Sequence, residues 1–263
     1  MVSIFRLGHS HRVWRISKDE VDITYPQESI RAVRFRAQPK NLTVDLNRCA
    51  VMVIDMQNDF CSPGGWLHSV GVDIERVRRV VPPLQVLLPF ARKEGIPVIW
   101  VNWGNRPDRL NLSPATLFVY KRDEDEIGIG EALPHNGSKV LEKGSWGADI
   151  IEELPRDERD VYVDKFRMSG FWDTPLDSIL RNMGVTTLFF CGVNTDQCVM
   201  STLQDACFLG YDCVLLEDCT ATTSPDFCWE ATLYNVKQCY GFVSTSTALI
   251  QATAESETKN RQT

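Results

Sequence analysis

Short apolar runs alternate along this chain with longer segments whose apolar positions recur at helical spacing. The apolar runs predict strands at residues 49–55, 96–103, 160–165, 185–193, 211–218 and 241–245. The helical pattern predicts helices at residues 73–94, 174–184, 197–209 and 225–238. Strands that alternate with helices favour right-handed βαβ units and a sheet covered on both faces. We therefore predict a doubly wound, three-layer α/β/α domain with a mainly parallel sheet.

The two ends of the chain depart from this alternation. Residues 11–25 alternate with the strand period on both sides of a turn-like SKDE, which predicts a β-hairpin, and residues 26–48 read as an irregular strap. We thus expect an N-terminal extension over 1–45, the main domain over 46–250 and a disordered polar tail over 251–263. Within the domain, residues 104–145 form the longest irregular section, and loops of that length are usually functional or mobile.

Composition limits the partners. The chain has 263 residues, 43% hydrophobic and 24% charged, as in a globular protein with one sizeable core. The net charge of −7, without a basic cluster, argues against nucleic acids and anionic membranes. No apolar stretch is long enough for a signal peptide or a membrane span. Nine cysteines without a spacing framework indicate reduced thiols and a cytoplasmic location.

Chemically useful side chains follow four of the predicted strands. Asp55 ends the first strand, Asn102 and Trp103 end the second, Lys165 ends the third, and Cys198 follows the fourth. Ligands of an open parallel sheet bind at the carboxyl ends of its strands. The topology therefore brings an aspartate, a lysine and a cysteine to one edge.

Each of these three residues also has an ordinary structural interpretation. Asp55 is either a turn cap or a base, and Lys165 is either a solvated lysine or a buried cation that needs an anion. Cys198 is either a small buried hydrophobe or a reactive thiol. Its place in the first turn of a helix favours reactivity, because free N–H groups and the helix dipole lower a thiol's pKa. By contrast, we expect inert packing roles for Cys191, Cys207, Cys213 and Cys219.

Other chemistries have less support. None of the four histidines ends a predicted strand, so a Cys–His pair would need a histidine from a loop. Neither C-x-x-C nor H-x-x-x-H occurs, and we predict no metal site. The GIG at residues 128–130 lacks the strand and lysine of a phosphate loop. We predict no cofactor.

Three motifs in order resemble the isochorismatase-like cysteine hydrolases. They are VIDMQNDF (53–60), VDKFRMSGF (163–171) and CGVNTDQCV (191–199), and LLEDCTATT (215–223) also matches. The resemblance spans roughly residues 45–250 and implies the same doubly wound fold. It leaves the N-terminal hairpin unexplained.

The resemblance also implies roles for the three residues. Asp55 would take the thiol proton, Lys165 would hold both anions, and Cys198 would attack. A cis peptide would precede the cysteine, here at Val193–Asn194, and would turn the Asn194 N–H toward the point that the Cys198 N–H also faces. These two donors would form an oxyanion hole, and the reaction would be amide hydrolysis through a thioester.

Members of that family differ in substrate. Isochorismatases proper lack the cysteine, and nicotinamidases carry histidines after the second strand, where this chain has WVNWGNRPDRLN. KGSW (143–146) and SGFWDTPLDSILR (169–181) resemble ureidoacrylate amidohydrolases, whereas GNRPDRLNLSP (104–114) is more like biuret hydrolases. A ureide such as biuret, triuret or ureidoacrylate is therefore the expected small-molecule substrate, with nicotinamide and N-carbamoylsarcosine as alternatives.

Polar and aromatic residues near the predicted edge could contact such a planar ureide. For each aromatic residue, a core position is the competing interpretation. The candidates are Gln57, Asn58, Phe60, Asn102, Trp103, Asn105, Arg106, Trp146, Phe171, Trp172 and Gln238.

A different class of function stays open, namely a small-molecule-binding or redox-sensing protein with Cys198 as its sensor thiol. Such a protein has no use for a proton acceptor, which Asp55 would supply. The resemblance further implies a homodimer or homotetramer, and the hairpin residues Val13, Trp14 and Ile16 are candidates for the interface. The competing interpretation is a hairpin that packs on its own subunit.

Overall fold

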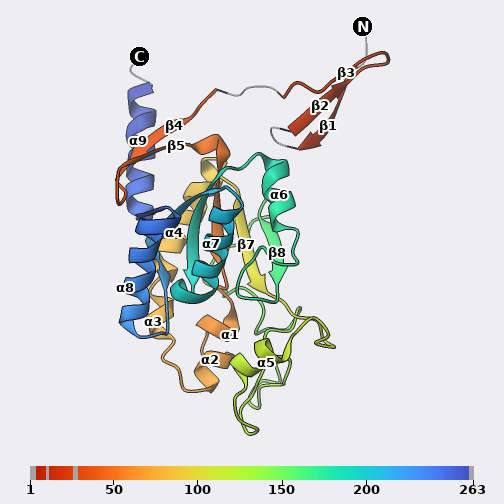
Figure 1. Cartoon of the computed structure of the whole chain (residues 1–263), viewed down its shortest axis with the longest axis vertical. Coiled ribbons are helices and arrows are strands. Elements are labelled where there is room, and N and C mark those ends of the chain that lie inside the picture. Colours follow the sequence, from red (N-terminus) through yellow and green to blue (C-terminus); the bar gives the residue numbers. More distant parts are fainter. Residues whose placement is uncertain (1–3, 10–11, 26–28, 261–263) are drawn as a thin grey trace.

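A six-stranded parallel sheet forms the centre of the protein, in the order β11-β10-β9-β6-β7-β8. The computed structural model describes residues 4–9, 12–25 and 29–260 (Figure 1). The strands are β6 (Cys49–Ile54), β7 (Val98–Trp103), β8 (Val161–Lys165), β9 (Thr187–Val193), β10 (Asp212–Ala221) and β11 (Phe242–Ser244). All six lie within or close to the predicted ranges, and the doubly wound three-layer prediction is confirmed.

Helices cover both faces of this sheet. The first face carries α3 (Glu75–Arg78), α4 (Val81–Lys93) and α9 (Ser246–Asn260), and the second carries α6 (Leu176–Met183), α7 (Met200–Phe208) and α8 (Asp226–Asn235). Successive residues of a strand point to opposite faces, so Val51 and Val53 pack in the first core and Met52 and Ile54 in the second. One helix was predicted over 73–94. It is instead two helices, because prolines at the start of α4 favour a new helix start.

Shorter elements gather beyond the carboxyl ends of the strands. They are α1 (Asn58–Cys61), α2 (Trp66–Ser69) and α5 (Pro114–Tyr120), at the lower end of Figure 1. Helix α5 lies inside the section predicted to be irregular. The π-helical turns η2 (Thr195–Val199) and η3 (Val236–Tyr240) precede α7 and follow α8, and the 3₁₀ turn η1 (Leu46–Arg48) leads into β6.

The prediction of a disordered tail was wrong. Helix α9 continues to Asn260, because Leu249 and Thr253 are buried against the domain and the Asp218 carboxylate accepts the Ser246 N–H at the helix start. Residues 261–263 of the predicted tail lie outside the described residues. Tertiary packing here outweighs the polar composition of the segment.

The strap was also wrongly predicted to be irregular. Strand β4 (Ala32–Phe35) pairs with β5 (Leu42–Asp45) in an antiparallel hairpin, with a cis Gln38–Pro39 bond between them. Val33 and Phe35 are buried in the first core, and β4 contacts α9. Alternating burial along β4 explains why this segment is a strand.

The predicted N-terminal hairpin is confirmed and carries a third strand. Strand β2 (Arg12–Ile16) pairs with β3 (Val21–Asp22) on one side and with β1 (Phe5–His9) on the other. His11, within the predicted hairpin, lies outside the described residues. Figure 1 shows this small sheet apart from the domain. We call residues 4–25 the arm.

All nine cysteines are free thiols. Among the described residues, no helix has the length and apolar character needed to cross a membrane.

Candidate active site

Asp55, Lys165 and Cys198 meet at the carboxyl edge of the sheet. Lys165 Nζ lies 2.9 Å from Asp55 Oδ2 and donates a hydrogen bond of 3.3 Å to Cys198 Sγ. It also donates to the Arg167 carbonyl at 3.1 Å. Three elements contribute the cluster: β6 ends before Asp55, β8 ends at Lys165, and η2 after β9 carries Cys198. The juxtaposition that the sequence predicted is therefore present, with the lysine between the other two.

The backbone at the edge determines where these side chains lie. Asp55 has φ of 52°, in the left-handed region that aspartate tolerates better than most residues, and its N–H donates to the Val101 carbonyl. Next to it, Gly192 has φ of 106°, and a Cβ there would lie 2.0 Å from the Ile54 carbonyl oxygen. Only glycine lets β9 pass β6 this closely and deliver Cys198 to the edge.

The segment between β9 and α7 contains the two backbone N–H groups, of Asn194 and Cys198, that the resemblance assigns to an oxyanion hole. Val193–Asn194 is a cis peptide bond, as the resemblance implied. The Asn194 N–H has no acceptor among the described residues. Within η2, the Val199 N–H donates an i→i+5 hydrogen bond to the Asn194 carbonyl (3.2 Å), and Cys198 directly precedes this donor. The Thr202 hydroxyl holds the Cys198 carbonyl at 2.6 Å.

Burial dominates the electrostatics of the cluster. It raises the pKa of Asp55, and the Lys165 charge offsets only part of that increase. Burial lowers the pKa of Lys165, but Asp55 and Cys198 together outweigh this effect and raise it overall, so the lysine stays charged. Burial and the Asp55 charge also raise the pKa of Cys198. The expectation of a lowered thiol pKa was therefore wrong. Desolvation of the thiol and the charge of the neighbouring carboxylate outweigh the effect expected from the N–H groups and dipole at a helix start.

Two aromatic residues form one wall beside the cluster. The Lys165 ammonium lies 4.5 Å from the centre of the Trp103 ring, a cation–π contact. Tyr120, at the end of α5, packs edge-on against Trp103 at 5.3 Å. Burial, with smaller contributions from Cys198 and Asp55, raises the pKa of Tyr120 well above its ordinary value. The sequence interpretation missed Tyr120, whose one signal was the apolar PATLFVY run after Ser113.

Gln57, Asn58 and Phe60 support the site rather than face a ligand. Both N–H groups of the Gln57 amide donate to backbone carbonyls, and its oxygen accepts the Trp103 N–H. The Asn58 amide donates to the Trp146 carbonyl and accepts the Ser62 hydroxyl. Phe60 is buried in the first core. Their predicted substrate contacts are contradicted, because the polar atoms are already paired and the ring is enclosed.

Besides the Asp55 carboxylate, several buried side-chain oxygens near this edge have no hydrogen-bond donor among the described residues, and three of them come from β7 and the loop beyond it. They are Asn102 Oδ1 at the end of β7, Asn105 Oδ1 just beyond it, and Glu142 Oε2. Asn105 and Glu142 form a parallel β-bridge, which places them side by side. The two asparagines were predicted. Glu142 was missed, because a glutamate in a charged loop looks like a solvated residue.

Another missed residue is Asp59, which holds the long loop against α1. Its buried carboxylate accepts the backbone N–H groups of Leu141 (2.7 Å) and Trp66 (3.1 Å). Burial raises its pKa to about 6 in spite of these bonds. A Cβ on Gly147 would lie 2.3 Å from the carboxylate, so the loop approaches it closely. The polar run after Asp55 was the only sequence signal.

The remaining predicted contacts lie elsewhere. Arg106 is exposed and pairs with Asp108 at 2.6 Å, and Trp146 is also exposed. Phe171 and Trp172 line a hollow with the end of α7, because their loop turns along that helix. Gln238 lies in η3, just before β11 begins, and is therefore at the amino edge of the sheet, opposite the cluster. These positions contradict contact by Phe171, Trp172 and Gln238.

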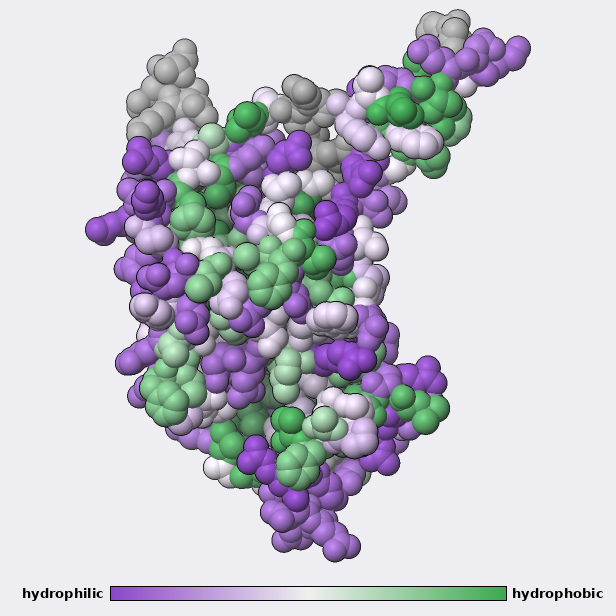
Figure 2. Space-filling view, in the orientation of Figure 1, coloured by the Kyte–Doolittle hydropathy of each residue, from purple (hydrophilic) through white to green (hydrophobic). Residues whose placement is uncertain are grey.

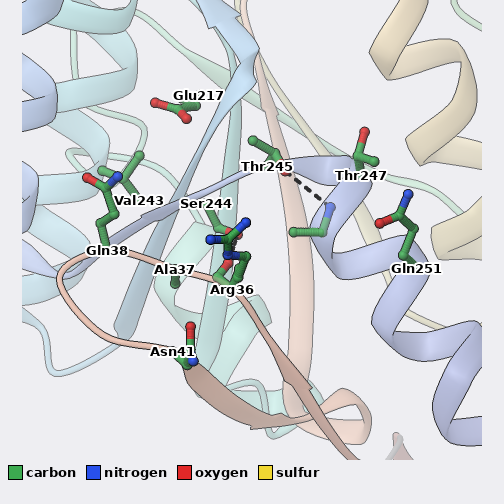
Figure 3. Close-up of a pocket in the computed structure, with 11 residues that line it drawn as sticks. Arg36, Ala37, Gln38, Asn41, Glu217, Val243, Ser244, Thr245, Thr247 and Gln251 are labelled. Carbon is green, nitrogen blue, oxygen red and sulfur yellow. Dashed lines mark hydrogen bonds between the residues drawn. The ribbon is translucent and has the colours of Figure 1, made fainter.

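A cavity of about 630 Å³ lies away from the cluster, between the β4–β5 hairpin, β11 and the start of α9 (Figure 3). Arg36, Gln38, Glu217 and Gln251 are among its lining residues. The dashed bond in Figure 3 is the helix cap from the Ala248 N–H to the Thr245 hydroxyl, at 3.1 Å. None of the three clustered residues lines this cavity.

Comparison with known proteins agrees with this geometry. The isochorismatase domain model matches residues 49–248. A cysteine hydrolase from Pseudomonas syringae pv. phaseolicola 1448A superposes with a TM-score of 0.69 at 26% identity, over 88% of this chain and 100% of that one. An isochorismatase family protein from Desulfovibrio vulgaris subsp. vulgaris str. Hildenborough gives 0.64 at 29% identity, over 79% and 98%.

An N-carbamoylsarcosine amidase from Thermoplasma acidophilum shares the fold, with a TM-score of 0.57 at 24% identity over 76% of this chain and 96% of that one. The domain match begins at Cys49, so the arm and the β4–β5 hairpin lie outside it. Over the part of the chain that the structure describes, no group of three or more His, Cys, Asp or Glu residues could hold a metal ion. The chain belongs to the isochorismatase family, as one of its cysteine hydrolases.

Proposed function

We propose that the protein is an amidohydrolase that cleaves a terminal ureido C–N bond and releases ammonia. The observation that carries this proposal is the position of the Lys165 ammonium, in contact with both Asp55 and Cys198 inside a buried cluster. A sensor thiol needs a low pKa to react with oxidants, whereas the pKa of Cys198 is raised. A buried thiol beside a carboxylate suits a nucleophile that loses its proton only as it attacks.

In the first step, the Asp55 carboxylate takes the Cys198 proton while sulfur bonds to the substrate carbonyl carbon. The carbonyl π electrons move to oxygen, and the N–H groups of Asn194 and Cys198 stabilise the resulting oxyanion. The oxyanion then collapses, the C–N bond breaks, and Asp55 gives its proton to the leaving nitrogen. Ammonia departs and the rest of the ureide remains on Cys198 as an S-carbamoyl thioester, R–NH–C(=O)–S.

In the second step, Asp55 takes a proton from water as its oxygen attacks the thioester. The tetrahedral intermediate collapses with cleavage of the C–S bond, and Asp55 returns the proton to sulfur. Lys165 remains protonated throughout, because its raised pKa keeps the cation beside whichever partner carries negative charge. The cluster thus returns to its starting state after each turnover.

The unpaired acceptors favour a substrate rich in N–H donors. Asn102 Oδ1, Asn105 Oδ1 and Glu142 Oε2 are buried without a donor, which is costly unless a ligand supplies one. Biuret, triuret and ureidoacrylate each carry several N–H groups on a planar frame. The KGSW and SGFWDTPLDSILR segments support the same substrate class through their resemblance to ureidoacrylate amidohydrolases.

Ammonia release from a panel of biuret, triuret, ureidoacrylate, N-carbamoylsarcosine and nicotinamide tests the proposal. We expect turnover of at least one of the three ureides, and none with Cys198→Ser. Intact-protein mass spectrometry of a quenched reaction should show an acyl adduct on the wild type that the variant lacks. Undiminished turnover by Cys198→Ser would refute the mechanism. No turnover of any compound in the panel would favour the alternative of a small-molecule-binding protein.

A further inference from the structure

The arm is a three-stranded sheet with one almost wholly apolar face. Residues paired across antiparallel strands share a face. Phe5 pairs with Ile16, Leu7 with Trp14, and Ile16 with Val21, so all five side chains lie on one side. We call these five residues the arm face. Arg12 lies on the same side at one end, whereas Arg6 and Arg15 lie on the opposite side.

The arm face is largely exposed, and Tyr25 of the arm itself contacts it, beside Trp14 and Arg12. Phe5, Leu7, Trp14 and Val21 are 56%, 57%, 42% and 50% exposed. Between residues 4–25 and residues 29–260, no hydrogen bond or ion pair is formed by the described residues. Val13, a predicted interface residue, is buried on the opposite side of the sheet and is not available. A small sheet needs its apolar face covered to be stable, so the arm requires a partner surface.

The domain carries an apolar hollow of matching character. Phe171, Trp172, Asp205, Phe208 and Leu209 line a depression of about 320 Å³ at the end of α7. We call it the α7 hollow. Trp172 and Phe208 are 61% and 73% exposed. Figure 2 shows hydrophobic surface on the arm and again over the region of α7.

The charges of the two surfaces are complementary. Asp205 is half-buried in the hollow, and within the described residues its carboxylate forms no hydrogen bond or ion pair. Arg12 supplies a cation on the side of the arm face, where its guanidinium lies over the Tyr25 ring at 5.6 Å. A carboxylate inside an apolar contact needs such a partner.

We propose that the arm of one copy packs its face into the α7 hollow of a second copy, with Arg12 beside Asp205. Every copy carries both surfaces, so a reciprocal exchange closes a twofold dimer without leaving either surface free. The strap is attached to its own domain through the buried β4 side chains and the Arg31–Glu94 ion pair (2.7 Å). The arm itself forms no hydrogen bond or ion pair with that domain among the described residues, so it is the segment that can pack on a second copy.

Photo-crosslinking of the full-length protein tests this contact. A benzophenone amino acid at position 14 should give a product of twice the protomer mass, joined to residues 168–181 or 205–211 of the other copy. The same group at position 6, on the opposite side of the arm, should give at least tenfold less of that product. A link within one copy, from arm to arm, or to any other segment would overturn the proposal, and so would a product absent at 50 µM protein.

A second experiment exchanges the charges of Arg12 and Asp205. Asp205→Arg and Arg12→Asp should each reduce the position-14 crosslink at least tenfold, and the double variant should restore it. Arg6→Asp changes the net charge equally on the other side of the arm and should leave the yield unchanged. A double variant no better than the single ones would refute the Arg12–Asp205 pairing. Circular dichroism and the urea unfolding midpoint of each variant serve as the folding control, and they do not depend on the proposed activity.

Discussion

The Lys165 ammonium and the Asp55 carboxylate form an ion pair of 2.9 Å that is almost sealed from solvent, with side-chain exposures of 0% and 1%. A buried ion pair strongly destabilises a fold when one partner is removed, because the other charge stays behind without compensation. The same pair has a chemical use, since the Lys165 charge favours the ionised form of the Asp55 carboxylate next to the thiol. Stability and reactivity therefore depend on the same contact.

Replacing Lys165 by methionine should separate these two roles. Lys165→Met leaves Asp55 buried and unpaired, and we expect a loss of about 3–5 kcal/mol in the free energy of unfolding at pH 7. The matched control is the Lys165→Met/Asp55→Asn double variant, which should recover much of that loss in urea denaturation. Both variants should be at least 100-fold less active. A Lys165→Met protein as stable as the wild type would contradict the buried pair.

Activity should depend on pH through Asp55. The base must be a carboxylate, and burial raises its pKa above the ordinary 3.8. We therefore expect kcat/KM to fall as pH drops through that raised value, so that the acid limb lies above pH 3.8 rather than at it. Measurement of kcat/KM from pH 4 to 8 checks this direction. A rate that stays flat down to pH 4 would show that an ionised Asp55 is not required.

The resting thiol should carry its proton at neutral pH. Burial and the Asp55 charge raise the pKa of Cys198 above 9.0, although the nearby Lys165 opposes them. The thiolate absorbance at 240 nm should therefore not differ between wild type and Cys198→Ser at pH 7. Asp55→Asn removes the repelling charge and should move thiolate formation to lower pH. A thiolate signal in the wild type at pH 7 would mean that the lysine outweighs burial.

Asp59 should make the fold sensitive to pH. Its pKa rises from 3.8 to about 6 on folding, so the native state binds the proton more tightly than the unfolded chain. The stabilisation linked to this proton is fully present only below the unfolded pKa of 3.8 and is lost as pH rises through about 6. Asp59→Asn has no such proton, and its stability relative to wild type should improve by about 2 kcal/mol between pH 4 and 7. Parallel urea titrations at both pH values measure the difference, and an unchanged gap would refute it.

Gly192 should not tolerate a side chain. Alanine there would place its Cβ 2.0 Å from the Ile54 carbonyl oxygen at a φ of 106°, and we expect a loss of more than about 3 kcal/mol. Gly95 also has positive φ, at 70°, but a Cβ there meets nothing within 4 Å. Gly95→Ala should cost only about 1 kcal/mol. Equal losses for the two variants in denaturant unfolding would show that the close approach of β9 to β6 is unimportant.

Several sequence predictions failed for a common physical reason. Gln57 and Asn58 looked like polar residues that await a ligand, but backbone carbonyls from segments distant in the chain already occupy their amides. Gln238 lies at the amino edge of the sheet, opposite the cluster. Helix α8 starts after the carboxyl end of β10 and runs back along the sheet, so η3 with Gln238 comes at the start of β11. Composition suggested a disordered tail over 251–263, yet α9 continues to Asn260 and buries Thr253 against the domain. In each case the deciding partner comes from elsewhere in the sequence.

What the sequence by itself determined is the architecture and the common edge of Asp55, Lys165 and Cys198. Apolar periodicity can be read from neighbouring residues alone. Strands joined by right-handed crossovers are parallel, so their carboxyl ends, and the residues that follow them, lie at the same edge of the sheet. Only the tertiary structure decided that Lys165 lies between the other two, that burial raises the thiol pKa, and that Tyr120 packs against the Trp103 wall beside the cluster. Distances and desolvation depend on atoms brought together by folding, and a linear pattern does not contain them.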